Sequence, residues 1–122
     1  DGPVPERRVL DIVTDPRTDG AHDTVLCDTL GQAVPYQVAA LVRAAKAATP
    51  QRRIVFHGHD TWGMGVANSL AALSAGADLV DGALGGLGGC PFARAPPATS
   101  APRTSSAWPA RWACRRASTS RR

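Results

Sequence analysis

The chain has 122 residues, a length that suits one domain with a modest hydrophobic core. Its net charge of +4 is unevenly distributed, because residues 1–93 carry seven basic and ten acidic side chains, whereas residues 94–122 carry seven arginines and no acid. The basic character therefore belongs to the end of the chain, and the sequence does not describe a uniformly basic nucleic-acid-binding domain.

The sequence shows neither a signal peptide nor a membrane span. Its first residues have no basic start and no apolar run, and polar residues interrupt the most apolar region, 66–87. Its three cysteines are an odd number at wide spacing, which predicts reduced thiols rather than a disulfide framework. We therefore expect a cytoplasmic protein that has no membrane partner.

Helical and strand patterns alternate along residues 5–81. The predicted elements, in chain order, are a helix over 5–13 that Pro16 ends, a strand over 24–27, a helix over 36–48, a strand over 53–56, a helix over 65–75 and a strand over 78–81. In the last of these helices the apolar positions are Val66, Leu70 and Leu73, and Gly76 is expected to cap its C-terminus. Cys27, inside the first strand, is expected to pack in the core.

This alternation predicts an α/β fold with a parallel sheet. The polar residues of chemical interest follow the strands directly: Asp28, His57, His59 and Cys90. In a (β/α)₈ TIM barrel that edge of the sheet is the active-site face, and in a flavodoxin-like open sheet it also binds ligands. Three strands cannot close a barrel, so the barrel interpretation predicts a fragment of one.

Residues 94–122 differ in kind from the rest of the chain. They contain no Gly, Val, Leu, Ile, Met or Phe, and the segment is rich in Arg, Ala, Pro and Ser. Such a composition cannot build a core, so we expect a disordered C-terminal tail beside a domain over residues 1–93.

His57 and His59 are candidate metal ligands. Residues i and i+2 of a strand point to the same side, so the two imidazoles can meet one divalent ion. Asp60 offers a carboxylate that could orient an imidazole. The alternative is that the two histidines are polar loop residues beside a turn.

Cys90, Asp28 and Asp81 are candidates of weaker individual weight. Cys90 follows a glycine-rich loop that could carry it over a site as an acid or base, or could be a plain surface loop. Asp28 and Asp81 each end a strand, where a carboxylate binds substrate, supports a metal or caps the following loop. Asn68, inside a helix, is expected to make a local hydrogen bond.

Three strings of the sequence together resemble the hydroxymethylglutaryl-CoA lyase family. They are VLCDTLGQAVPYQV, FHGHDTWGMGVANSLAAL and GADLVDGALGGLGGCPFA, and with their order and spacing the resemblance covers about residues 1–93. The H-x-H-D-T part is shared by a wider group of barrel lyases, aldolases and synthases. The part GLGGCP-aromatic-A is much more specific to acyl-CoA lyases.

The resemblance implies a (β/α)₈ barrel that uses Mg²⁺ or Mn²⁺ to cleave an acyl-CoA substrate, 3-hydroxy-3-methylglutaryl-CoA, into acetyl-CoA and acetoacetate. By resemblance His57 and His59 match the family's metal ligands, Cys90 its catalytic cysteine on a mobile loop, and Asp28 an acidic residue of the active site. His57 and Cys90 are the candidates for proton transfer. Relatives also imply a homodimer.

The sequence departs from the family pattern in two places. The family's N-terminal strands, with an Arg-Asp pair that supplies another metal ligand, are absent, so we expect a barrel truncated at its N-terminus. The family also continues after its CPFA-like string with G-A-S/T-G-N and T-E-D-L-V, in which the Asn is a metal ligand. A shifted reading frame after about residue 93 permits GATGNVGTEDLV, so we expect residues 94–122 to be out of frame, and sequencing the locus tests this.

Two other functions remain open from the sequence. One is a related enzyme of the same barrel group, such as a homocitrate or isopropylmalate synthase or a 4-hydroxy-2-oxovalerate aldolase. The other is an Arg-rich nucleic-acid-binding protein that works through the tail, with Trp108 and Trp112 stacking on bases. Binding that falls steeply with salt would indicate the latter.

Overall fold

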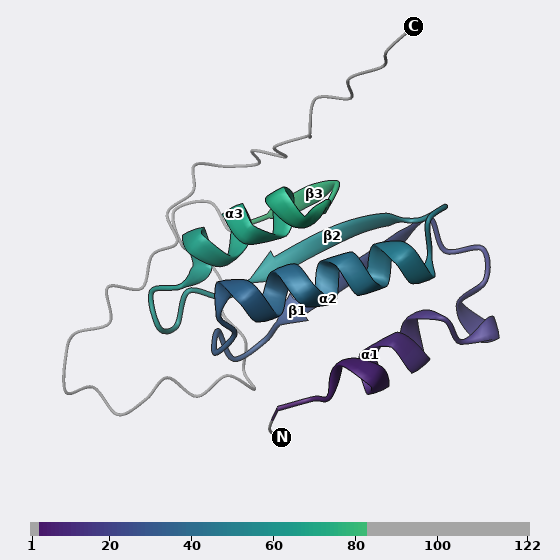
Figure 1. The fold of residues 1–122 in the computed structure, drawn as a ribbon, viewed down its shortest axis with the longest axis horizontal. Coiled ribbons are helices and arrows are strands. Elements are labelled where there is room, and N and C mark those ends of the chain that lie inside the picture. The colour runs from purple at the N-terminus through teal and green to yellow at the C-terminus, as the bar shows by residue number, and fades with distance from the viewer. Residues whose placement is uncertain (1–2, 83–122) are drawn as a thin grey trace, which may run out of the picture.

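The computed structural model describes residues 3–82. Its elements are α1 (Glu6–Val13), a short 3₁₀ helix (Pro16–Thr18), β1 (Asp23–Asp28), α2 (Pro35–Ala48), β2 (Arg53–Gly58), α3 (Gly65–Ala75) and β3 (Leu79–Asp81), arranged as Figure 1 shows. The predicted order of helices and strands is confirmed, and α1 ends before Pro16 as expected. Cys90 and the tail over 94–122 lie outside the described residues.

The three strands form one parallel sheet in the order β1-β2-β3. Helices α2 and α3 pack against each other and both contact β2, so the two crossovers lie on one face of the sheet (Figure 1). A sheet whose strands follow in sequential order, with its helices on one face, winds like a barrel wall. A flavodoxin-like sheet would instead reverse its strand order at a switch point.

The helix-covered face of the sheet holds the hydrophobic core. The buried core residues are Leu26, Val38, Val42, Ala45, Ile54, Phe56, Ala72 and Ala77. Alternation along the strands sends Leu26 and Phe56, which are partners in the register, into this core. The same alternation turns the neighbouring pair, Cys27 and His57, to the opposite face.

Helix α3 presents a different face to the core than the sequence predicted. Val66 is 51% exposed and Leu70 is 66% exposed, whereas Gly65, Asn68 and Ala72 are buried. Ala72 packs in the core that α2 also lines, and Gly65 lies against Asp60, where a Cβ would come within 2.9 Å of the carboxylate. The predicted cap is confirmed, because Gly76 adopts φ +110° and its N–H donates to the carbonyl of Leu73.

Arg52 fastens α1 and the 3₁₀ helix to the start of β2. Its side chain is only 5% exposed. The guanidinium donates to the carbonyl of Val13 at 2.8 Å, to the carbonyl of Thr18 at 2.8 Å and to the hydroxyl of Thr18 at 3.0 Å. The carboxylate of Asp19 lies 3.6 Å away. The buried charge is thus satisfied by the carbonyl of Val13, at the end of α1, and by the carbonyl and hydroxyl of Thr18, in the 3₁₀ helix.

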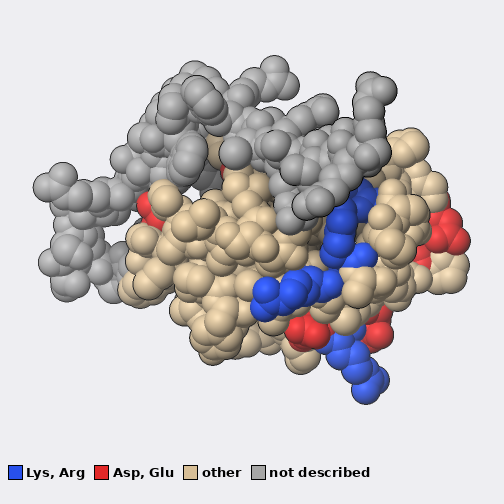
Figure 2. All heavy atoms as spheres, turned by 45° about the horizontal axis from the view of Figure 1, so that its top comes forward, with Lys and Arg blue, Asp and Glu red and all other residues tan. Residues whose placement is uncertain are grey.

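Basic and acidic side chains lie beside one another on the face in Figure 2, where they gather toward one end. The ion pairs include Arg53 with Asp23 and Lys46 with Asp78. On that face the described residues therefore show charges of both signs side by side. Within residues 3–82, none of the three α-helices could span a lipid bilayer.

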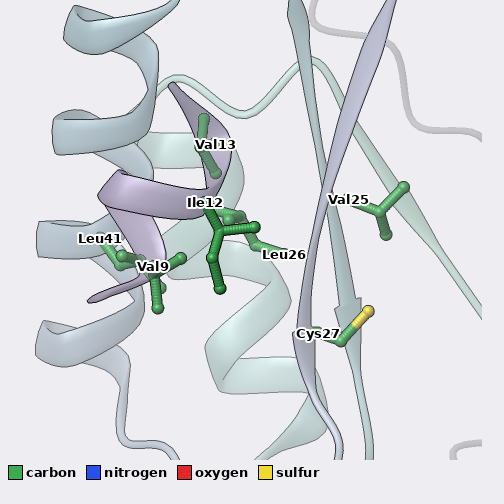
Figure 3. A pocket seen from close by; sticks show the side chains of 7 residues that line it. All are labelled: Val9, Ile12, Val13, Val25, Leu26, Cys27 and Leu41. Atoms are coloured by element: carbon green, nitrogen blue, oxygen red, sulfur yellow. The ribbon is translucent and has the colours of Figure 1, made fainter. Parts of the chain in front are cut away.

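A small apolar hollow lies along β1 beside α1 (Figure 3). It is lined by Val9, Ile12, Val13, Val25, Leu26, Cys27 and Leu41. In Figure 3, Val25 and Cys27 leave β1 on the side away from α1, and Val9 and Ile12 belong to α1. β1 pairs only with β2 in the described sheet, so the hollow follows the outer edge of that sheet.

Candidate functional site

Two histidines at the end of β2 form the centre of the site. The Nε2 atoms of His57 and His59 lie 3.3 Å apart, and the two rings meet edge to face at an interplanar angle of 75°. His57 belongs to β2, and His59 follows Gly58, the last residue of that strand. The i, i+2 spacing thus brings two ring nitrogens together, as the sequence predicted.

The distance between these nitrogens suits a shared divalent ion. Two nitrogens bound to one ion at about 2.1 Å, with roughly 90–110° between them, lie about 3.0–3.4 Å apart. The observed 3.3 Å falls in this range. It also suits one N–H···N hydrogen bond, so substitution must distinguish the two explanations. Within residues 3–82, no third His, Cys, Asp or Glu joins the pair.

Asp81 provides the carboxylate partner of this pair. Its Oδ1 lies 2.7 Å from Nδ1 of His57, and Asp81 and His57 are register partners on neighbouring strands. The prediction that Asp60 orients an imidazole is wrong, because Asp60 Oδ1 accepts the N–H of Gly65 at 2.6 Å. The start of α3 leaves backbone N–H groups without helical partners, and Asp60 satisfies one of them.

Asp28 organises the loop after β1. Its carboxylate oxygens accept the N–H groups of Gln32 and Ala33, each at 3.1 Å. Its carbonyl accepts the N–H of His59 at 3.4 Å, which ties this loop to the histidine pair. The loop-capping alternative is therefore confirmed, and a contact of Asp28 with substrate stays a prediction.

Gly31 lets the same loop approach the histidine turn. Its φ is +66°, a conformation that side chains other than glycine rarely adopt. A Cβ at this position would lie 2.8 Å from Thr61 Oγ1 and 2.9 Å from the carbonyl oxygen of His59. Glycine is required here both for the backbone conformation and for the space.

Asn68 links α3 to the loop before α2. It is fully buried, and its Nδ2 donates to the carbonyl of Ala33 at 2.8 Å. The predicted local hydrogen bond is therefore wrong, since Ala33 is 35 residues away in the chain. The Oδ1 of Asn68 has no hydrogen-bond donor in the described structure.

Cys27 lies beside the histidine pair rather than in the core. The prediction that it packs inside is wrong, because strand alternation gives the core position to Leu26 and leaves Cys27 an exposed, free thiol. Partial burial raises the pKa of this thiol, and the nearby charge of Asp81 raises it further. At neutral pH Cys27 is therefore a thiol and not a thiolate.

The HMGL-like family model matches residues 2–96. The chain belongs to the HMGL-like family. It is 45% identical over 93 residues to an (R)-citramalyl-CoA lyase of Chloroflexus aurantiacus, which covers 76% of the chain and 29% of that relative. It is 46% identical over 70 residues to a 4-hydroxy-2-oxovalerate aldolase of Azoarcus, which covers 57% of the chain and 20% of that relative.

The fold agrees with this family membership. The crystal structure of the HMG-CoA lyase from Brucella melitensis superposes with a TM-score of 0.68 at 39% identity, which covers 76% of the chain and 33% of that structure. The three parallel strands and their helices are thus an α/β fragment of a TIM-barrel-like HMGL domain. The chain spans less than a third of the length of the two curated relatives.

Proposed function

We propose that this HMGL-like chain carries part of the active site of a metal-dependent acyl-CoA lyase. The observation that carries the proposal is the pair of Nε2 atoms 3.3 Å apart on the sheet face that α2 and α3 leave uncovered. Two of the relatives named above are lyases, one of citramalyl-CoA and one of HMG-CoA. The proposed substrate is 3-hydroxy-3-methylglutaryl-CoA, which is cleaved to acetyl-CoA and acetoacetate.

His57 and His59 would hold the ion, Mg²⁺ or Mn²⁺. The ion, when bound, would polarise a substrate carbonyl and lower the pKa of a bound hydroxyl. The chain's own contribution is to hold the two imidazoles in place. Asp28 supports this from the loop after β1 by accepting the N–H of His59, and Gly31 leaves open the space beside the carbonyl of His59 that a Cβ would occupy.

The reaction needs one proton to leave and one to arrive. A base removes the proton of the C3 hydroxyl, the C2–C3 bond breaks, and its electron pair forms the enolate of acetyl-CoA. An acid then delivers a proton to C2 of that enolate. His57 and Cys90 are the proposed proton carriers and Asp28 a proposed active-site carboxylate, without a division of steps between them. Because Nε2 of His57 would hold the ion, His57 could exchange a proton only through Nδ1, which faces Asp81. An acyl-CoA partner and a homodimer belong to the same proposal.

The second candidate function is cleavage of a related substrate, and the 46% identity to a 4-hydroxy-2-oxovalerate aldolase supports it. HMG-CoA, citramalyl-CoA and 4-hydroxy-2-oxovalerate all carry a hydroxyl β to a carbonyl. The same bond cleavage therefore serves all three. Residues 3–82 contain the shared histidine pair, so they do not distinguish these substrates.

The test is to incubate the purified chain with each of the three compounds and with Mg²⁺ or Mn²⁺. We expect metal-dependent release of acetoacetate from HMG-CoA, and its loss in His57→Ala. His22→Ala is the matched control, because His22 is an exposed residue before β1 and should leave turnover unchanged. Faster cleavage of another compound would change the substrate, and no product from any of them would overturn the proposed activity of this chain by itself.

A further inference from the structure

The partnership of Asp81 with His57 distinguishes among the roles that the sequence left open for Asp81. Asp81 ends β3, and its register partner on β2 is His57, 24 residues earlier in the chain. The Oδ1–Nδ1 distance of 2.7 Å is that of a strong hydrogen bond. Among the ion pairs of residues 3–82, His57 is the partner of Asp81.

This hydrogen bond determines which nitrogen of His57 carries the proton. An ionised carboxylate only accepts hydrogen bonds, so the nitrogen facing it must be the donor. Nδ1 of neutral His57 therefore bears the hydrogen, and the lone pair lies on Nε2. Nε2 is the atom that faces His59.

We propose that Asp81 is a positioning residue, which fixes the tautomer and the ring orientation of His57 so that the Nε2 lone pair points to the site shared with His59. The proposal deepens the proposed metal site and rests on it for its consequence in metal binding. Carboxylates that hold the second nitrogen of a ligating histidine commonly act in this way. The tautomer itself is a property of this chain without any ion.

The neighbouring carboxylates do not replace Asp81. Asp60, which is closer to both histidines in sequence, is engaged by the N–H of Gly65. Asp78, three residues before Asp81, accepts hydrogen bonds from Lys46 and from the N–H of Ile54. Asp78 therefore offers a matched control: the same residue type, next to the same strand, with other partners.

The first experiment reads the tautomer of His57 by ¹⁵N NMR of the full chain without metal, at a pH where the imidazole is neutral. We expect the Nδ1–H form in the wild type and in Asp78→Asn, and a shift toward the Nε2–H form in Asp81→Ala. Asp81→Asn retains an oxygen that accepts from Nδ1–H, so it should keep much of the wild-type tautomer. Amide dispersion in the same spectra reports whether each variant is folded.

The second experiment measures the affinity for Mn²⁺ from the electron paramagnetic resonance signal of the free ion. We expect Asp81→Ala to bind Mn²⁺ about 10- to 100-fold more weakly than the wild type, with Asp81→Asn between them. Asp78→Asn should bind as the wild type does.

An unchanged tautomer in folded Asp81→Ala would overturn the positioning role, whatever happens to Mn²⁺ affinity. A fall in affinity without a change of tautomer would make Asp81 a direct contributor of charge instead. A tautomer that responds to Asp81→Ala in a chain that binds no Mn²⁺ would support the positioning role and overturn the metal site. Failure of the inference and failure of the proposed function are thus separate results.

Discussion

Replacement of Arg52 by Met should weaken the attachment of α1 to the sheet. The guanidinium is buried and donates three hydrogen bonds, two to backbone carbonyls and one to the hydroxyl of Thr18. Methionine fills much of the same volume along the side-chain stem but donates no hydrogen bond. The substitution therefore leaves the carbonyl of Val13, at the end of α1, with only the longer hydrogen bond from the hydroxyl of Thr18, at 3.2 Å.

The hydrogen bonds of Arg52 give the expected loss in the free energy of unfolding. A hydrogen bond from a charged donor contributes about 1.5–3 kcal/mol, so three of them would give roughly 4–9 kcal/mol if they were additive. Water can reach Thr18, which is only half-buried, and the freed segment regains conformational entropy. We therefore expect the free energy of unfolding to fall by about 3 kcal/mol, the lower end of the cost of breaking a buried charged interaction.

Urea unfolding of the purified chain, followed by circular dichroism, measures this loss. With an m-value of about 1–3 kcal/mol/M, the midpoint should fall by about 1–3 M. Arg53→Met is the matched control, because Arg53 is the next residue, is 52% exposed and pairs with Asp23 at the surface. Its midpoint should change much less, since exposed ion pairs stabilise little.

Limited trypsin digestion adds a local readout. Cleavage after Arg17, in the 3₁₀ helix, should accelerate in Arg52→Met and stay slow in Arg53→Met. If the two variants had equal urea midpoints and equal rates of cleavage after Arg17, the role of Arg52 in attaching α1 to the sheet would be refuted.

Three further substitutions test the loop after β1, the acid sensitivity of the Asp78–Lys46 pair and the buried amide of Asn68. Gly31→Ala should cost more than about 1 kcal/mol and weaken Mn²⁺ binding, because a Cβ meets Thr61 and the backbone of His59; Gly20→Ala, with φ +89° but open space, should cost less and leave Mn²⁺ binding unchanged. Burial alone would raise the pKa of the Asp78 carboxyl, but hydrogen bonds from Lys46 and the backbone lower it below its ordinary value. This pair therefore stabilises the fold at neutral pH, and the contribution is lost as the pH falls below about 4, so urea midpoints of Asp78→Asn should decline less steeply with acid than those of the wild type. Asn68→Ala should lower the free energy of unfolding by about 1–3 kcal/mol in the same assay, because the carbonyl of Ala33 loses its donor, and an unchanged midpoint would contradict this.

The sequence predicted the elements that depend on local pattern. Helical spacing and short apolar runs located α2, β1 and β2, and Gly76 located the end of α3. The histidine pair was also predictable, since i, i+2 spacing brings side chains to one side within a single strand.

Features that depend on contacts between distant elements were missed. The partnership of His57 with Asp81 depends on the register of β2 and β3, which no local pattern specifies. The hydrogen bond from Arg52 to the carbonyl of Val13 joins residues that are 39 apart in the chain, and a lone arginine before a strand does not predict it.

Helix α3 and Cys27 show a second kind of limit. Hydrophobicity alone placed Val66 and Leu70 inside, although the buried positions belong to Gly65, which lies against Asp60, and to Ala72, which packs in the core beside α2. For Cys27 the alternation of β1 decided the side, and a four-residue apolar run does not say which two of its residues face the helices.

Titration of the purified chain with Mn²⁺ tests the central claim, that His57 and His59 form a metal site, most directly. We predict one Mn²⁺ per chain in the wild type and in His22→Ala, and loss of binding in both His57→Ala and His59→Ala. Binding that persists unchanged in the two site variants, or a wild-type chain that binds no Mn²⁺, would contradict the claim and leave the 3.3 Å contact as a hydrogen bond between two imidazoles.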